Sequence, residues 1–117
     1  MKPNILKEKS YRFALRMVKL FQHLSVERKE YVLSKQILRS GTSIGANIEE
    51  AFQAESKSDF IHKLSIANKE AFETHYWLRL LRDGVVIENT VAESLLSDCD
   101  ELQRMLVSAI KTSKSRN

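Results

Sequence analysis

The sequence almost lacks the residues that end helices. Its one proline is Pro3, and its 117 residues include only three glycines, Gly41, Gly45 and Gly84. Proline ends helices because it lacks a backbone N–H and clashes with the preceding turn, so nothing from Asn4 onward forces a helix to stop. We therefore expect long helices along nearly the whole chain.

Apolar side chains recur at steps of three and four residues in four segments, the spacing that gathers them on one face of a helix. This periodicity predicts helices over about 5–24, 27–54, 58–83 and 90–111. The short gaps between them favour antiparallel packing of neighbouring helices. We therefore predict an all-α, up-and-down four-helix bundle, formed as one domain by residues 1–117.

Local residues predict where these helices begin and end. Ser25 is the expected cap of the second helix. Ser56 with Asp59, and Thr90 with Glu93, have the spacing of capping boxes at the third and fourth helices. Gly84 stands where a left-handed residue is expected after the third helix, and the short apolar run 85–87 is expected to dock the following loop on the core.

The expected core faces include Val91, Leu95 and Cys99 on the fourth helix. The third helix carries a second apolar face, made of Ile61, Ile66, Phe72, Tyr76, Trp77 and Leu80. A helix inside a bundle needs one apolar stripe, so a second stripe indicates contact with another subunit. The alternative is a wide face turned toward a bulky core.

Composition and cysteine usage narrow the class of protein. The chain is 43% hydrophobic and 29% charged, as expected of a folded domain. Its single cysteine, Cys99, permits no disulfide within the chain and suits a reducing cytoplasm. We find no secretory signal in the basic, polar start of the chain and no apolar run of about 20 residues. A cytoplasmic protein without a membrane segment is expected.

The segment from Ser40 to Asn47 places two glycines inside a predicted helix, at a cost of about 1 kcal/mol each relative to alanine. Gly41 and Gly45 share one face, which would allow another helix to approach closely. Ser43 and Asn47 could hydrogen-bond across this contact or back to a carbonyl of their own helix. A phosphate-binding loop is excluded, because neither the Gly-Lys-Ser/Thr sequence nor a preceding strand is present.

The acidic and histidine residues do not match a metal site or an active site. Glu70 and Glu73 lack the histidine that a dinuclear helical motif requires, and Asp59 with His62 has suitable spacing but stands alone. We expect Glu50 and Glu70 to lie near the core and to pair with Arg39, Lys69 or a helix terminus. No metal, cofactor or catalytic residue is predicted, and the chain is not expected to be an enzyme.

The first helix carries most of the basic character of the chain. Residues 1–24 hold six basic side chains against one acidic, although the whole chain has a net charge of only +4. At about 100° per residue, four of these cations and His23 fall within an arc of about 80°; they are Lys9, Arg12, Arg16 and Lys19. Such a stripe is typical of nucleic-acid binding. The alternative is a solvated helix face.

The residues 36–51 (QILRSGTSIGANIEEA), Asp59-Phe60 and 67–78 (ANKEAFETHYWL) carry a resemblance that extends over nearly the whole chain. They resemble the bacterial four-helix-bundle family also called the 23S rRNA intervening-sequence, or S23, protein family. Its members look like homopentamers, and a related protein is the accessory factor of diversity-generating retroelements, which binds a reverse transcriptase and nucleic acid. By this resemblance fold and assembly roles are implied for Arg39, Ser43, Asn47, Glu50, Glu70 and Trp77.

These observations predict a non-catalytic homo-oligomer, with a pentamer favoured by the resemblance. Its first helix is expected to bind RNA or DNA through its cations. The alternative is a protein–protein scaffold, or an accessory subunit of a nucleic-acid enzyme, suggested by the two apolar faces of the third helix.

Overall fold

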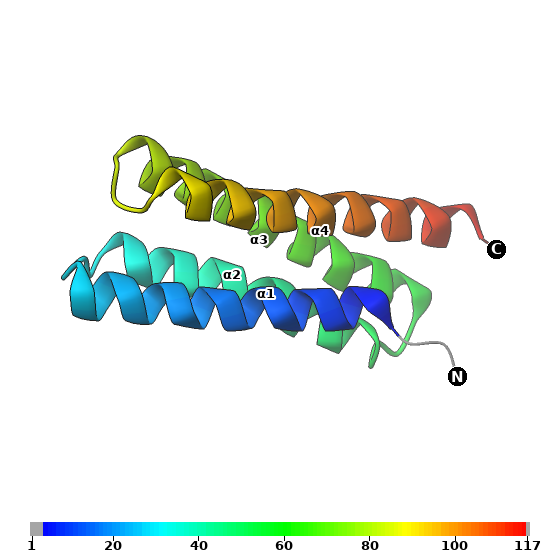
Figure 1. Ribbon diagram of the computed structural model, residues 1–117. Coiled ribbons are helices and arrows are strands. Elements are labelled where there is room, and N and C mark those ends of the chain that lie inside the picture. The colour runs from blue at the N-terminus through cyan, green and yellow to red at the C-terminus, as the bar shows by residue number, and fades with distance from the viewer. Residues whose placement is uncertain (1–3, 117) are drawn as a thin grey trace.

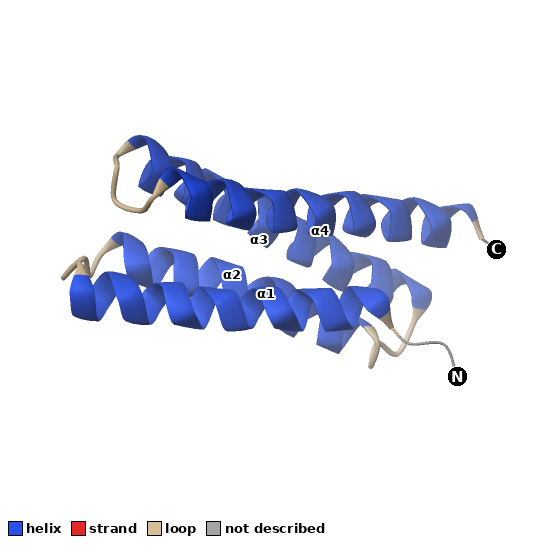
Figure 2. Ribbon diagram, viewed as in Figure 1, coloured by secondary structure: helices blue, strands red, loops and turns tan. Residues whose placement is uncertain are grey.

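The computed structural model describes residues 4–116, and all regular structure in this range is helical (Figure 2). The elements are α1 (Ile5–Gln22), a π-helical turn η1 (His23–Glu27), α2 (Leu33–Ala51), α3 (Lys57–Asp83) and α4 (Asn89–Ser115). The four α-helices lie side by side with connections at alternate ends (Figure 1). This confirms the predicted up-and-down bundle, which measures 49 × 25 × 20 Å. None of the helices described between residues 4 and 116 has the length and apolarity needed to cross a bilayer.

Apolar side chains from all four helices fill one continuous core. Met17, Ile44, Leu64 and Leu106, one from each helix, are fully buried at its centre. The expected inward position of Val91 is wrong, because this side chain is 40% exposed on the side of α4 that is turned toward α1. Helices α1 and α4 pack least extensively of the neighbouring pairs, so this side of α4 is poorly covered.

The predicted boundary between the first two helices is wrong. The first helix continues through η1 to Glu27, and α2 begins only at Leu33. Ser25 therefore caps nothing, and its hydroxyl donates to the carbonyl of Phe21 at 2.7 Å. At its other end α2 stops at Ala51 rather than 54, because the chain turns there with the N–H of Ala54 bonded to the Ala51 carbonyl.

Glu30 performs the role that was assigned to Ser25. Its carboxylate accepts hydrogen bonds from the backbone N–H groups of Val32, Leu33 and Ser34, at 3.2, 3.0 and 2.7 Å. Desolvation acts to raise the pKa of Glu30, but the three N–H donors outweigh it and the pKa is lowered. Because a long side chain reaches the helix start from outside it, the usual short capping residue was not needed.

Of the two caps predicted at the starts of the long helices α3 and α4, one is confirmed and one is wrong. Ser56 caps α3 as predicted, and its Oγ accepts from the N–H of Asp59 at 3.0 Å. Thr90 is not a cap, because α4 already begins at Asn89 and its N-cap residue, Glu88, makes no side-chain capping bond. The helix also extends to Ser115, four residues beyond the predicted end.

The end of α3 places the left-handed residue one position later than predicted. Gly84 has φ −79°, whereas Val85 has φ 58°. The Val85 N–H bonds to the Arg82 carbonyl and the Val86 N–H to the Leu81 carbonyl, which is the Schellman pattern with Val85 as its left-handed residue. Ile87 is buried as expected, but Val85 is 78% exposed.

The two glycines of α2 face α1 within the same subunit. A Cβ added at Gly41 would lie 2.6 Å from Met17 Sδ, whereas one added at Gly45 would lie 3.4 Å from its nearest neighbour, the Ser10 carbonyl oxygen. Met17 is completely buried. The packed Met17 side chain therefore leaves no room for a Cβ at Gly41, whereas Gly45 lies at ordinary contact distance from the α1 backbone.

Replacing Val85 with Asn should stabilise the protein. A β-branched residue in the left-handed region is strained by about 1–2 kcal/mol, whereas Asn visits this region readily. We expect Val85→Asn to raise the free energy of unfolding by about 1 kcal/mol in urea titrations. Val26, also strongly exposed but without a positive φ, provides the matched control. An equal gain from Val26→Asn would contradict the strain argument.

The two glycines of α2 should respond differently to alanine. Gly41→Ala drives a methyl group into the buried Met17 side chain and should destabilise by about 1–3 kcal/mol, as overpacked cores do. Gly45→Ala has room and gains helix propensity, so its unfolding free energy should stay equal or rise by up to about 1 kcal/mol. Urea unfolding of the two variants measures the difference, and an equal loss in both would refute the assigned packing.

Candidate functional site

Of the four predicted cations of α1, Lys9 and Arg16 bind acidic side chains of α4, so the four do not form a free stripe. Lys9 Nζ lies 2.9 Å from Glu101 Oε1, and Arg16 Nη1 lies 2.6 Å from Asp98 Oδ2. All four side chains of these two pairs are partly exposed. Exposed pairs of this kind contribute about 1 kcal/mol or less, so they neutralise charge without holding the helices firmly.

Arg12 and Lys19 are the remaining cations of this face. Both are exposed, and within residues 4–116 neither has an acidic partner within ion-pair distance. The acidic partners of Lys9 and Arg16 stand one turn apart on α4, at Asp98 and Glu101. Their three-residue spacing was a local sign that α4 carries an acidic face complementary to the cations of α1. This sign was not recognised in the sequence.

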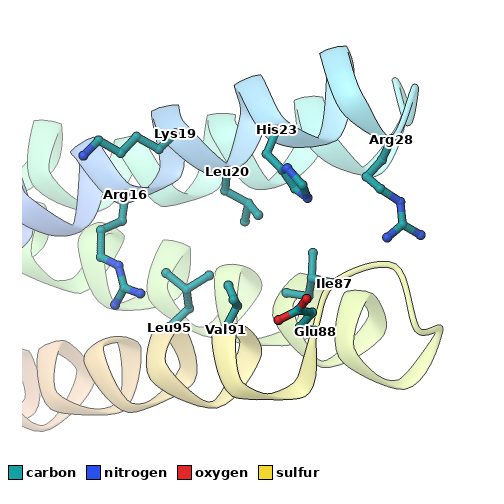
Figure 3. A pocket seen from close by; sticks show the side chains of 9 residues that line it. All are labelled: Arg16, Lys19, Leu20, His23, Arg28, Ile87, Glu88, Val91 and Leu95. Atoms are coloured by element: carbon teal, nitrogen blue, oxygen red, sulfur yellow. The ribbon is translucent and has the colours of Figure 1, made fainter.

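The sparse contact between α1 and α4 leaves a cleft near one end of the bundle (Figure 3). It has a volume of about 500 Å³ and lies between the last turns of α1, the start of α4 and the loop before it. A smaller hollow of about 190 Å³ lies further along the same seam, beside Lys9 and Arg12. The basic face therefore borders an opening in the bundle rather than a flat helix surface.

Arg39 links α2 to α3 through two carboxylates. Its guanidinium lies 3.2 Å from Glu70 Oε2 and also binds Glu73. The hydrogen bond to Glu73, together with the charges of Glu70 and Glu73, raises the pKa of Arg39. The predicted pairing of Glu70 with Arg39 is confirmed. Glu50 differs from the prediction, because it is exposed and binds Lys63 at 3.0 Å on the outside of the bundle.

The polar residues of the glycine-containing segment make their hydrogen bonds within the chain. Ser43 Oγ donates to the Arg39 carbonyl at 2.6 Å, and Asn47 Nδ2 donates to the Ser43 carbonyl at 2.8 Å. Of the two predicted alternatives, the structure shows bonding back to the same helix. Thr74 Oγ1 donates a buried hydrogen bond to Ser40 Oγ at 2.9 Å, which joins α3 to α2. The sequence did not predict this bond.

The second apolar face of α3 is only partly free. Trp77 packs against the core, and its Nε1 has no hydrogen-bond partner. Phe72, Tyr76 and Leu80 remain on the surface, with 61%, 48% and 39% of their area exposed. On α1 a separate apolar row is exposed and is made of Tyr11, Leu15 and Val18. The described part of the chain thus carries two apolar patches on different helices.

Cys99 is enclosed in the core, and its thiol contacts the Ala71 carbonyl at 3.3 Å. Burial, with a smaller contribution from Asp100 and Asp98, raises the pKa of the Cys99 thiol to about 12. A thiol with this pKa remains protonated at neutral pH and is a poor nucleophile. Within residues 4–116 no three His, Cys, Asp or Glu side chains gather in an arrangement that could hold a metal ion.

Comparisons with known proteins agree with this architecture. The sequence model of the 23S rRNA-intervening sequence protein family matches residues 2–108. A crystal structure of a protein of unknown function from Bacteroides thetaiotaomicron, described as belonging to the S23 ribosomal protein family, is 56% identical. It superposes with a TM-score of 0.92 over 95% of this chain and 99% of that one. No functionally curated protein matches the chain.

Proposed function

The chain belongs to the 23S rRNA-intervening sequence protein family, and from this premise we propose that it is a non-catalytic, oligomeric RNA-binding protein. The proposed RNA-binding surface is the cationic side of α1. The observation that carries the proposal is that Arg12 and Lys19 are exposed beside Arg16 and lack acidic partners within residues 4–116. The solved relative is described as a protein of unknown function, so the proposal rests on this surface rather than on the family name.

The two paired cations can join this surface. Lys9 and Arg16 are held by exposed ion pairs that contribute about 1 kcal/mol or less each. A phosphate group can replace a carboxylate as their partner, and release of counterions from the nucleic acid adds to the driving force. Arg12 and Lys19 would make the first contacts, and Lys9 and Arg16 would follow when the pairs to α4 exchange. Binding should therefore be moderate in one subunit and strongly dependent on salt.

Assembly would multiply this modest surface. The apolar row on α3 (Phe72, Tyr76 and Leu80) and the row on α1 (Tyr11, Leu15 and Val18) are different surfaces of one subunit. Contact between such unlike patches is heterologous, and repeated heterologous contacts close into a ring when the rotation allows it. A ring is consistent with the pentamer that the family resemblance implies. It would display several copies of the cationic face together.

The contact on α1 would leave the cations free. At about 100° per residue, the row containing Tyr11 and Val18 is rotated by roughly 90° around the helix from Arg12 and Lys19. A neighbouring subunit seated on that row would therefore not cover the cationic side. Self-association and RNA binding are compatible on the same helix.

Removing the two unpaired cations should weaken RNA binding. We expect Arg12→Glu/Lys19→Glu to lower affinity for a structured RNA by about tenfold or more at 50 mM salt, because two phosphate contacts become repulsive. Fluorescence anisotropy measures the change. Lys35→Glu/Lys69→Glu makes the same charge change at exposed cations of α2 and α3, and its effect should be much smaller. Equal losses in the two variants would reject a defined site on α1.

Releasing the two paired cations should have the opposite effect. Asp98→Asn/Glu101→Gln leaves Lys9 and Arg16 without their acidic partners on α4. We expect this variant to bind RNA more tightly, with a steeper dependence on salt concentration, because more counterions are released. Unchanged affinity would show that Lys9 and Arg16 take no part.

The proposed heterologous contact can be tested by breaking each side separately. Phe72→Glu and Leu15→Glu should each reduce the mass measured by light scattering toward that of the monomer, because each places a charge in one apolar patch. Tyr31→Glu, at an exposed aromatic outside both patches, is the control and should not change the mass.

Mixing the two broken variants distinguishes the type of contact. Phe72→Glu retains an intact α1 patch and Leu15→Glu an intact α3 patch, so the mixture should form dimers through one intact interface. An isologous contact, in which the same patch meets itself, could not be restored in this way. A monomeric wild-type protein would overturn the assembly proposal outright.

A further inference from the structure

The cleft between α1 and α4 has features of a small-molecule site, and it shares only Arg16 and Lys19 with the proposed RNA-binding surface. Its volume of about 500 Å³ lies in the range of small-molecule sites, about 300–1,000 Å³. The last turns of α1 form one wall, and the start of α4 with the preceding loop forms the other (Figure 3). The cleft is partly open to solvent, so a ligand could enter without rearrangement of the core.

The apolar part of the cleft is aliphatic. Leu20, Ile87 and Leu95 form its floor, and the partly exposed Val91 projects from α4 beside them. No Phe, Tyr or Trp lines the described cleft, so it offers no platform on which a nucleobase would stack. An aliphatic chain is the ligand group that fits this floor.

The polar part of the cleft is dominated by donors. Figure 3 shows His23 and Arg28 directed into the space between α1 and the loop before α4, whereas Lys19 extends along the outer side of α1. The side chain of Arg28 has no acidic partner within ion-pair distance in residues 4–116. Glu88 is the single acid of the rim, and His23 is bound by Glu27 from its own turn.

The backbone at the two helix ends adds to this imbalance. The carbonyl groups of His23 and Leu24 at the end of the first helix already accept from the N–H groups of Arg28 and Glu30. The side chain of the N-cap residue Glu88 makes no capping bond and the first turn of α4 holds no acid, so its leading N–H groups present the positive end of the helix dipole. The start of α4 therefore favours an anion in the cleft, and the bonded carbonyls at the end of the first helix oppose an anion less than free carbonyls would.

An unusual local conformation sets the positions of His23 and Arg28. The chain passes through the π-helical turn η1 and then through Lys29 with φ 52°, before α2 begins. Such π-helical turns occur frequently at functional sites. Here the turn ends at the cleft, and the residues at either end of it, His23 and Arg28, line the wall opposite α4.

We propose that this cleft binds an anionic amphiphile, an aliphatic chain that ends in a carboxylate or a phosphate. The chain lies on Leu20, Val91 and Leu95, and the head group lies between Arg28 and His23. This function goes beyond the proposed RNA binding. The residues that bind its head group, Arg28 and His23, are not among the proposed RNA contacts. Fatty carboxylates and alkyl phosphates share the chemistry, and the experiment separates them.

The test is titration of the full-length protein with decanoate and with decyl phosphate, each below its micelle concentration, followed by methyl NMR and calorimetry. We expect saturable shifts of the Leu20, Val91 and Leu95 methyl groups with at least one of the two probes, and the tighter one identifies the head group. Decyltrimethylammonium, with the same chain length and the opposite charge, should bind at least tenfold more weakly. Adenosine monophosphate should not bind.

Three variants locate the site. Arg28→Glu should weaken binding by about tenfold or more, since the head group then meets a like charge. Val91→Asp should abolish it by placing a charge on the chain path, and Val91 is exposed enough to accept the change without loss of the fold. Lys35→Glu, which changes an exposed cation on α2, is the charge-matched control and should leave binding unchanged.

Several results would overturn the proposal. Equal binding of the cationic amphiphile, an affinity insensitive to Arg28→Glu, or shifts confined to the exposed patch of Phe72 and Tyr76 would each exclude the assigned site. Binding of adenosine monophosphate in preference to decanoate would replace the amphiphile with a nucleotide. None of these results alters RNA affinity in the Arg12→Glu/Lys19→Glu test, so failure of one proposal is distinguishable from failure of the other.

Discussion

The side chain of Met17 occupies the space that a side chain at position 41 would fill, and this contact draws α1 onto α2. A glycine at this contact lets the Met17 side chain pack directly on the backbone of α2. On the other side of the bundle α3 joins α2 and α4 by extensive packing. The remaining pair, α1 and α4, packs least extensively.

The surface features with functional potential follow from this unequal packing. The seam between α1 and α4 is spanned by two exposed ion pairs, Lys9 with Glu101 and Arg16 with Asp98. Weak pairs across an open seam keep charged groups near solvent, where they can exchange partners. At one end of the seam the gap widens into the cleft beside Arg28. Both proposed binding surfaces therefore border the helix pair that contributes least to the fold.

The fold could be predicted from sequence because its cause is repeated many times along the chain. Apolar residues every three or four positions specify a helix even when the inward position of one of them is predicted wrongly, as that of Val91 was. Helix ends depend on single residues and were predicted less well. Glu30 caps α2 from three residues before it, and Val85 takes the left-handed position although Gly84 stands beside it with the more suitable chemistry.

The candidate site was predicted less well, because pairing between helices is not a local property. Arg16 and Asp98 lie 82 positions apart, so the charge of the α1 face could not be judged from α1 alone. The residues most conspicuous in the sequence are largely satisfied within the subunit: Arg39 by Glu70 and Glu73, Ser43 and Asn47 by their own helix. Groups satisfied in this way stabilise the fold and have little left to offer a ligand. The proposed partners therefore contact groups that internal pairing leaves over, which are the unpaired cations of α1, the apolar row on α3 and the donors around the cleft.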